Sequence, residues 1–257
     1  MSDRSKRQFY AGAWHGDEPY DEKEQVRLVK ACQAVHGHAE SLPAGRRYDL
    51  LDVGCGVGPL RRWLPAEEFN IVGLEISPEA AAAARENYDA CEVGDAESPW
   101  PLEAESFDGV HAGAVMEHVM DWHAPLNQAN RVLRTGGLIV ISVPNLRYWK
   151  EIRRLIRGRQ PHWLRSMGHI HGYTPRFLRE LVTIHGFEVD RLEADRVNLP
   201  LMPRRNLWLE RHFAGIGSVL ILTGRLARRV RVEDRALAGQ FARTEPLALR
   251  SVEVLEE

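Results

Sequence analysis

The first 145 residues alternate between short apolar runs and longer segments in which apolar positions recur every three or four residues. Short apolar runs bounded by glycine or proline are typical of buried strands, and the longer period is typical of helices. The predicted strands are 48–53, 70–76, 90–93, 107–113 and 137–143. The predicted helices are 22–41, 57–65, 77–88 and 122–133. This alternation predicts an α/β fold with a mostly parallel sheet, right-handed crossovers and helices on both faces.

The second half of the chain is less regular. Residues 147–185 have a helical pattern interrupted by a loop that contains Gly, Pro and His, and 186–194 is predicted to be a strand. The segment 207–231 is apolar in its middle and rich in Arg at its end, which indicates a helix despite three glycines. Residues 246–256 alternate between apolar and polar positions, so they are predicted to form the final strand. A single domain accounts for the whole pattern.

Composition and charge limit the function classes. The 257 residues carry a net charge of −2, which argues against a nucleic-acid-binding protein. The amino terminus has no apolar leader, and the late apolar stretch 213–224 is shorter than the roughly 20 residues of a transmembrane helix. Three widely spaced cysteines match neither a disulfide framework nor a zinc site, so we expect a cytoplasmic protein without a resident metal. The Arg-rich segments 147–165 and 204–235 are solvated helix faces or a basic rim for an anionic partner.

A glycine-rich turn, Asp52-Val-Gly-Cys-Gly-Val-Gly58, directly follows the first predicted strand. Glycines let the backbone approach a ligand closely, and the helix start that follows offers N–H groups. The spacing differs from the GxGxxG of dinucleotide-binding loops, which disfavours a nicotinamide-dependent oxidoreductase. Taken alone, this motif is also explained as a tight turn with a purely structural role.

Two acidic residues strengthen the ligand-binding interpretation. Glu75 ends the second strand, where a carboxylate can accept both ribose hydroxyl hydrogens, and Asp95 follows the third strand, where it can accept from an exocyclic amine such as adenine N6. Either residue alone is as well explained as a solvated loop carboxylate. Together with Asp52 they follow three successive strands, and the carboxyl edge of such a sheet is where ligands bind.

The motifs LLDVGCGVG, VGLEIS, GDAES, FDGVHAGAVMEHV and RVLRTGGLIVISVPN, in this order, resemble class I S-adenosylmethionine-dependent methyltransferases of the small-molecule type 11/type 12 group. HGYTPRFLRELVTIHGFEV extends the resemblance beyond residue 145, and VPNLRYW is faintly similar to methionine-biosynthesis methyltransferase-like proteins and to sugar or lipid O-methyltransferases. The resemblance implies a Rossmann-like seven-stranded sheet whose last strand is antiparallel, which 246–256 would supply. It divides the single domain 1–257 into an N-terminal helical cap (1–45), a cofactor-binding core (46–145) and a substrate-side half (146–257) with a helical insertion (200–235).

The same resemblance implies S-adenosylmethionine as cofactor and assigns its contacts. The methionine moiety would lie against Asp52, Gly54, Cys55 and Gly56, with Ala114 and the segment Met116-Glu117-His118 beside the sulfonium. The ribose would contact Glu75 and Ile76, and the adenine would contact Asp95 and Ala96. In many relatives the leading segment folds over the cofactor, which makes Tyr10 and Trp14 candidates, although simple packing on the sheet also explains them.

Four residues at the expected active-site mouth are candidates for catalysis: His118, His169, His171 and Tyr173. A histidine can assist deprotonation of a hydroxyl acceptor because its unperturbed pKa is about 6.5. His118 is as well explained as a loop-supporting residue.

We therefore expect O-methylation of a small-molecule hydroxyl or carboxyl acceptor, with anionic acceptors favoured by the basic rim. The alternative is a methyltransferase-like protein that binds the cofactor and regulates another enzyme. The segment 207–231 is predicted to pack on the domain or in a homodimer, or to contact an anionic membrane surface.

Overall fold

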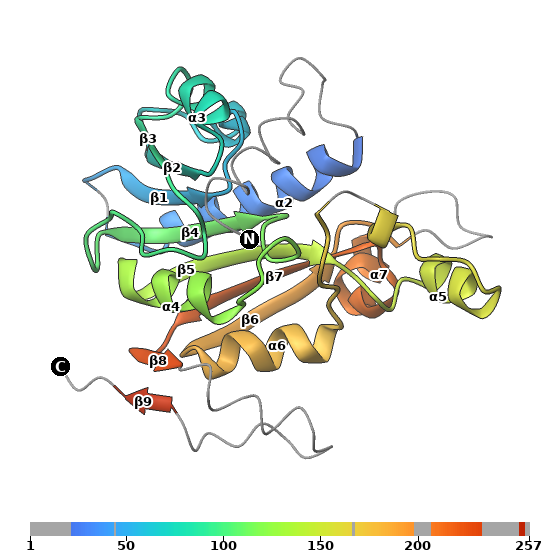
Figure 1. Cartoon of the computed structure of the whole chain (residues 1–257). Coiled ribbons are helices and arrows are strands. Elements are labelled where there is room, and N and C mark those ends of the chain that lie inside the picture. Colours follow the sequence, from blue (N-terminus) through green and yellow to red (C-terminus); the bar gives the residue numbers. More distant parts are fainter. Residues whose placement is uncertain (1–21, 44, 166–167, 198–206, 233–251, 255–257) are drawn as a thin grey trace.

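A computed structural model describes residues 22–43, 45–165, 168–197, 207–232 and 252–254. Its centre is a seven-stranded sheet in the order β3-β2-β1-β4-β5-β7-β6 (Figure 1). The strands are β1 (Tyr48–Val53), β2 (Phe69–Glu75), β3 (Ala90–Val93), β4 (Phe107–Gly113), β5 (Leu133–Pro144), β6 (Phe187–Ala194) and β7 (Val219–Leu226). The first five are parallel, and β7 runs antiparallel to both β5 and β6. The predicted sheet type and strand number are confirmed.

Helices cover both faces of the sheet, as the alternation predicted (Figure 1). The helices are α2 (Glu22–Ala39), α3 (Pro78–Ala84), α4 (His123–Val132), α5 (Trp149–Ile156), α6 (Pro175–Ile184) and α7 (Leu207–His212). Three short 3-10 helices complete them: η1 (Pro59–Arg62), η2 (Trp163–Arg165) and η3 (Ala214–Ile216). Within the described residues, every helix is too short or too polar to cross a lipid bilayer.

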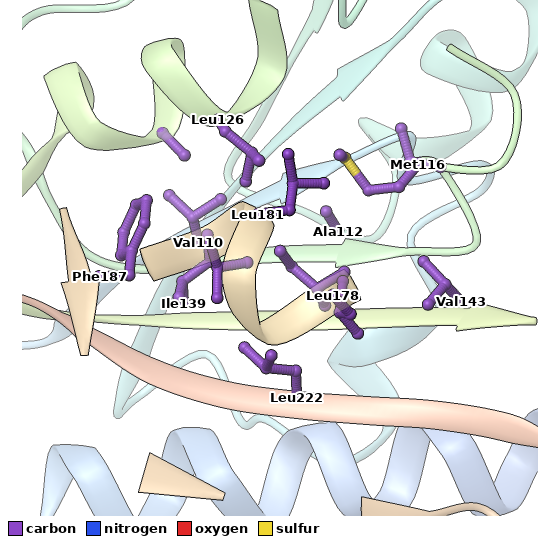
Figure 2. Close-up of a cluster of buried hydrophobic side chains, with 14 of the residues drawn as sticks. Val110, Ala112, Met116, Leu126, Ile139, Val143, Leu178, Leu181, Phe187 and Leu222 are labelled. Atoms are coloured by element: carbon purple, nitrogen blue, oxygen red, sulfur yellow. The ribbon is translucent and has the colours of Figure 1, made fainter. Parts of the chain in front are cut away.

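Neighbouring residues of each central strand enter different cores, because side chains alternate between the two faces of a strand. Leu50 packs in the core beneath α2 and α3, whereas Leu51 packs in the larger core beneath α4 and α6. Figure 2 shows this larger core, in which Val110 and Ile139 of the sheet meet Leu178 of α6. Both faces of the strands are therefore apolar, which is why they appear in the sequence as continuous apolar runs.

Local sequence sets the start of the helices that follow the strands. The Ser77 hydroxyl accepts a hydrogen bond from the amide of Ala80 at 3.2 Å, and Pro78 occupies the first helical turn of α3. Thr174 caps α6 in the same way, by accepting from the amide of Phe177 at 3.2 Å. The predicted N-terminus of the Ala-rich helix is confirmed.

Three predicted elements were wrong. The segment 207–231 is not one helix: it contains α7, η3, β7 and the start of β8 (Val230–Val232), so the described part of the predicted helical insertion 200–235 is more strand than helix. Its apolar middle is β7, which is paired on both edges and buried on both faces, so it lacks a strand's alternation. The seventh strand of the sheet is therefore β7 and not 246–256, of which β9 (Val252–Val254) pairs with β8 in a separate two-stranded sheet. Residues 57–65 form only the short η1.

Candidate active site

The register of the sheet aligns the candidate residues along one edge. Val53 lies beside Leu74 of β2 and Ala112 of β4, and Glu75 lies beside Val93 of β3. The residues that follow these strands therefore emerge together at the carboxyl edge, where open α/β sheets bind their ligands. The sequence prediction that these strand ends converge is supported by this register.

The glycine turn adopts backbone conformations that side chains disfavour. Gly54 and Gly56 have φ values of 63° and 55°, in the left-handed region. A Cβ on Gly54 would lie 2.5 Å from Cγ2 of Val115, so the turn after β1 is in close contact with the loop after β4. The amide of Gly54 also donates to the carbonyl of Leu74 at 2.7 Å. These contacts explain why glycine is required at position 54.

Glu75 connects the glycine turn to the start of α3. Its Oε2 accepts from the amide of Gly56 at 2.9 Å, and its Oε1 accepts from the amide of Ser77 at 2.9 Å. Burial raises the pKa of this carboxyl, and the backbone hydrogen bonds act in the opposite direction. A carboxylate has about four acceptor positions, so Glu75 can hold these two amides and still accept from a ligand diol. Ile76, the next residue, is half-buried.

Asp52 is buried beneath the glycine turn, where its carboxylate is bound by two other side chains. Its Oδ1 accepts from Nδ1 of His111 at 2.7 Å, and its Oδ2 accepts from the hydroxyl of Tyr88 at 2.7 Å. The Tyr88 hydroxyl in turn accepts from the amide of Leu60 at 3.1 Å, at the start of η1. All three side chains are buried. Both oxygens of Asp52 thus have side-chain partners that support the turn, and its direct contact with a ligand stays a prediction.

Cys55 also faces the interior. Its Sγ lies 3.6 Å from Sγ of Cys91, and a Cβ on Gly73 would lie only 2.6 Å from the same sulfur. Burial and the neighbouring thiol raise the pKa of Cys55. Cys55 can therefore face a ligand only with its backbone.

The loop after β3 lies beside Glu75. The amide of Gly94 donates to the carbonyl of Glu75 at 2.9 Å, which fixes the start of this loop. Asp95 is largely buried, and its Oδ1 accepts from the amide of Glu97 at 3.0 Å. Ala96 is partly buried, and its carbonyl accepts from Nε1 of Trp100 at 3.2 Å. Asp95 and Ala96 are thus placed one strand away from Glu75, in the position expected for an adenine site.

The loop after β4 begins with a strained residue. Ala114 has a φ of 59°, which is rare for a residue with a Cβ, and its amide donates to the carbonyl of Ser142 at 3.0 Å. Such strain is most often found at functional sites. Met116 inserts into the larger core (Figure 2), which anchors the loop.

Three of the candidate polar residues lie close together: Glu117 and His118 in this loop, and His169 in the segment before α6. Oε1 of Glu117 lies 4.0 Å from Nε2 of His169, and the rings of His118 and His169 are 4.7 Å apart. His171 packs edge-to-face against Trp122 with ring centroids 4.5 Å apart. Burial raises the pKa of Glu117 to about 7 and lowers the pKa of His118 to about 4. The pKa values of His169 and His171 are also lowered by burial, so all three imidazoles are neutral at pH 7.

Tyr173 occupies a different position from the histidines. Its side chain is 0% exposed, and its hydroxyl donates to the carbonyl of Met116 at 2.6 Å. Burial raises the pKa of this phenol well above its ordinary value. We assign Tyr173 to supporting the loop after β4, in place of the catalytic role expected from the sequence. Tyr10 and Trp14 lie outside the described residues.

Sequence reasoning did not identify Tyr88 and His111. Tyr88 resembles an ordinary aromatic residue after a helix, but a histidine in the middle of the apolar run FDGVHAG was a signal for a buried polar partner. A surface hollow of about 570 Å³ is lined by residues such as Tyr48, Phe69 and Asp108. These residues lie at the amino ends of β1, β2 and β4, so the hollow is at the opposite edge of the sheet from the glycine turn.

Comparisons with known proteins agree with this geometry. A family model described as a methyltransferase domain matches residues 20–192. The ubiquinone biosynthesis O-methyltransferase of Bradyrhizobium sp. (strain ORS 278) is 33% identical over 134 residues, which are 51% of this chain and 53% of that protein. The sterol 4-C-methyltransferase strm-1 of Caenorhabditis elegans is 25% identical over 142 residues, 52% of this chain and 42% of that protein. This chain therefore spans about half the length of these curated relatives.

Solved structures share the fold. A SAM-dependent methyltransferase of Thermotoga maritima superposes with a TM-score of 0.58 at 21% identity, covering 87% of this chain and 95% of that one. An S-adenosylmethionine-dependent methyltransferase of Mesorhizobium loti has a TM-score of 0.52 at 18% identity, covering 77% and 99%. At these identities the likeness shows the architecture alone.

Proposed function

Because this chain belongs to the class I S-adenosylmethionine-dependent methyltransferases, we propose that it transfers the methyl group to an oxygen atom of a small-molecule acceptor. The family assignment rests on the matched methyltransferase domain and the shared sheet topology, and it makes the protein an enzyme that uses S-adenosylmethionine. It favours an enzyme over the cofactor-binding regulator that the sequence also allowed. The choice of oxygen rests on one observation: neutral histidine side chains gather beyond the loop after β4.

The carboxyl edge of the sheet fits the cofactor. Gly54 is exposed and offers backbone without a side chain, and the Glu75 carboxylate keeps acceptor positions for two ribose hydroxyls. Asp95 and Ala96 would flank the adenine. The bound cofactor supplies an electrophilic methyl group on a sulfonium, so the protein's main tasks are to position the acceptor and to exclude water.

Neutral imidazoles suit an oxygen acceptor. A neutral imidazole has one nitrogen that accepts a hydrogen bond, so it can orient an acceptor O–H group. His118 and His169 lie beside Glu117, on the loop that also touches Gly54 through Val115. We assign these histidines to orientation of the acceptor hydroxyl, and His171 to the wall of the acceptor site beside Trp122.

The surface near this site supports an apolar acceptor that approaches from an anionic membrane. All eight exposed large hydrophobic residues of the described chain come from segments that follow β4: Met120, Ile152, Leu155, Ile156, Leu164, Ile170, Trp208 and Phe213. Three of them are on α5, which lies beyond the carboxyl end of β5 (Figure 1). They are flanked by cationic side chains: Lys150, Arg153, Arg154 and Arg157. An amphipathic helix of this kind is suited to an anionic lipid surface.

This α5 surface takes the place of the segment 207–231 in the membrane interpretation, because the apolar middle of that segment is the buried strand β7. The names of the two curated relatives, which refer to ubiquinone and sterol, support an apolar acceptor. Co-sedimentation with phosphatidylglycerol and phosphatidylcholine vesicles tests it. We expect binding to the anionic vesicles only, and at least fivefold weaker binding for Leu155→Ser with Ile156→Ser. The matched control is Met120→Ser, and equal loss in the control would contradict the assignment to α5.

Labelled cofactor tests the reaction itself. The purified protein is incubated with S-adenosylmethionine carrying a ¹³C methyl group and with hydroxylated aromatic, lipid and sugar acceptors. The chemical shift of the labelled methyl in the product distinguishes methylation of oxygen, nitrogen and carbon. We expect an O-methyl signal that Glu75→Gln abolishes. An N-methyl or C-methyl signal alone would overturn the proposed acceptor atom while leaving the family assignment intact.

A further inference from the structure

Glu117, His118 and His169 form a cluster whose ligand-type atoms all lie within 4.8 Å of one another. Glu117 and His118 come from the loop after β4, whereas His169 comes from the segment that leads into α6. Two backbone hydrogen bonds hold the two segments together: the amides of Ile170 and His171 donate to the carbonyl of Glu117 at 2.9 and 3.2 Å. The backbone therefore fixes the cluster without any help from its side chains.

One oxygen of the Glu117 carboxylate lacks the hydrogen bond that a buried acid normally has. The residue is 2% exposed, and its Oε2 has no hydrogen-bond partner among the described residues. Its other oxygen is 4.0 Å from Nε2 of His169, which is beyond hydrogen-bond distance. Burying a carboxylate costs several kcal/mol unless it is paired or bound to a metal. A hydrogen bond from the residue's own backbone N–H and the attraction of Arg27 only partly offset this cost, because burial remains the largest influence on the pKa of Glu117.

The two histidines are suited to metal binding and poorly suited to general-base catalysis. Burial lowers both pKa values, that of His118 to about 4, so both rings are neutral at pH 7. The neutral ring is the form that binds metals. A base with a pKa near 4, such as His118, has little driving force to take a proton from a hydroxyl group, since efficient bases have pKa values near the working pH.

We propose that Glu117, His118 and His169 bind one Zn²⁺ ion. Two imidazoles and one carboxylate are a ligand set of zinc enzymes, in which the fourth tetrahedral position is left for water or a substrate atom. Bonds of about 2.0–2.2 Å place tetrahedral ligands about 3.4 Å apart, so the ligand atoms would have to move inward by about 1 Å. The sequence did not indicate this site because His169 is remote from Glu117 along the chain, and the spacing matches no zinc motif.

The metal site also explains how the acceptor would be activated, an inference that rests on the proposed function. An acceptor hydroxyl in the fourth position would have its pKa lowered by the metal, as zinc lowers that of bound water. The O–H bond then breaks with release of the proton to solvent, the oxygen forms a bond to the methyl carbon, and the carbon–sulfur bond breaks. The metal would thus supply the activation that the weakly basic histidines do not.

Metal binding is tested directly on the full chain after treatment with a chelator. Titration with Co²⁺ is followed by visible absorption, because tetrahedral Co²⁺ has intense d–d bands, and Zn²⁺ is titrated by calorimetry. We expect one ion per chain, and at least 100-fold weaker Zn²⁺ binding for Glu117→Gln and for His169→Gln. The matched control is His171→Gln, which removes a neighbouring histidine outside the cluster and should bind Zn²⁺ as the wild type does.

The outcomes separate this proposal from the proposed function. Wild-type protein that gives no tetrahedral Co²⁺ spectrum, or a Glu117→Gln variant that binds Zn²⁺ as tightly as the wild type, overturns the metal site. A metal-free protein that forms the O-methyl product at the full rate removes the metal from catalysis and leaves the proposed function intact. A protein that binds Zn²⁺ but gives no O-methyl product overturns the proposed function and leaves the site.

Discussion

The substitution Glu75→Gln tests the cofactor site most sharply, because it keeps the size of the side chain and removes its charge. In the wild type each carboxylate oxygen accepts one backbone amide, from Gly56 and from Ser77, both at 2.9 Å. A glutamine can accept only one of them, and its NH₂ group then faces the other N–H. The ribose hydroxyls also lose one acceptor, because the amide of glutamine has one acceptor oxygen and one donor NH₂ group where glutamate has two acceptor oxygens.

The expected effect on binding is large. Hydrogen bonds to a charged group contribute about 1.5–3 kcal/mol each, so we expect the loss of about 2–4 kcal/mol of binding free energy, or roughly 30- to 1000-fold in Kd. The effect on stability is smaller, because burial raises the pKa of Glu75 and removal of the charge relieves that burial cost. The unpaired amide acts in the opposite direction. We expect the free energy of unfolding to change by less than about 2 kcal/mol.

Isothermal titration with S-adenosylhomocysteine and its 2′-deoxyadenosyl analogue separates the ribose contact from an indirect effect of the turn. The wild type should bind the analogue more weakly, whereas Glu75→Gln should not distinguish the two ligands. The control is Glu92→Gln on β3, an exposed carboxylate beside Leu74 in the register, which should behave as the wild type. Binding of S-adenosylhomocysteine by Glu75→Gln within threefold of the wild type would refute the assignment.

Four further substitutions test the glycine turn, its support and a buried histidine elsewhere in the fold. Tyr88→Phe leaves an oxygen of Asp52 without its donor, so urea denaturation should show a loss of about 1–3 kcal/mol with a smaller effect on cofactor affinity than Glu75→Gln. Gly54→Ala should abolish cofactor binding in titrations, since its φ of 63° and the 2.5 Å approach to Val115 both exclude a Cβ, and Val115→Ala should restore part of it. Burial lowers the pKa of His185 to about 3 in the folded protein. Between about pH 6.5 and 3 this histidine is therefore protonated in the unfolded chain and neutral in the folded protein. The free energy of unfolding should decrease as the pH falls through this range. His185→Gln should flatten that decline by up to about 1.4 kcal/mol per pH unit in urea denaturation measured from pH 7.5 to 4.5; an unchanged slope would contradict the pKa assignment.

The sequence predicted those elements whose signals are local. β1 and β4 have the predicted bounds, because each is a short apolar run with a glycine at or just beyond its end. The start of α3 was predictable from Ser77-Pro78, since capping involves only neighbouring residues. The convergence of Glu75 with the glycine turn was also predictable, because parallel strands end at the same edge.

Features that depend on contacts between distant segments were not predictable in this way. The strand β7 is apolar on both faces because each face packs in one of the two cores, and from the sequence alone such a run is indistinguishable from a buried helix. The partners of Asp52 are likewise remote along the chain: Tyr88 comes from the turn between α3 and β3, and His111 from the middle of β4. An acid in a strand-end motif therefore indicated a candidate site, but not which partners its oxygens have.

The same contacts would couple cofactor binding to the conformation of the glycine turn. Glu75 holds the amide of Gly56 with the carboxylate that would also hold the ribose, so the adenosine and methionine halves of the cofactor share one connecting group. Asp52 fixes the turn from the opposite side through Tyr88 and His111, which leaves the oxygens of Glu75 as the part of this network that a ligand can reach. A change behind the turn should therefore weaken both halves of the cofactor alike, whereas a change at Glu75 should weaken the ribose contact first. This difference is what the deoxyribose analogue measures.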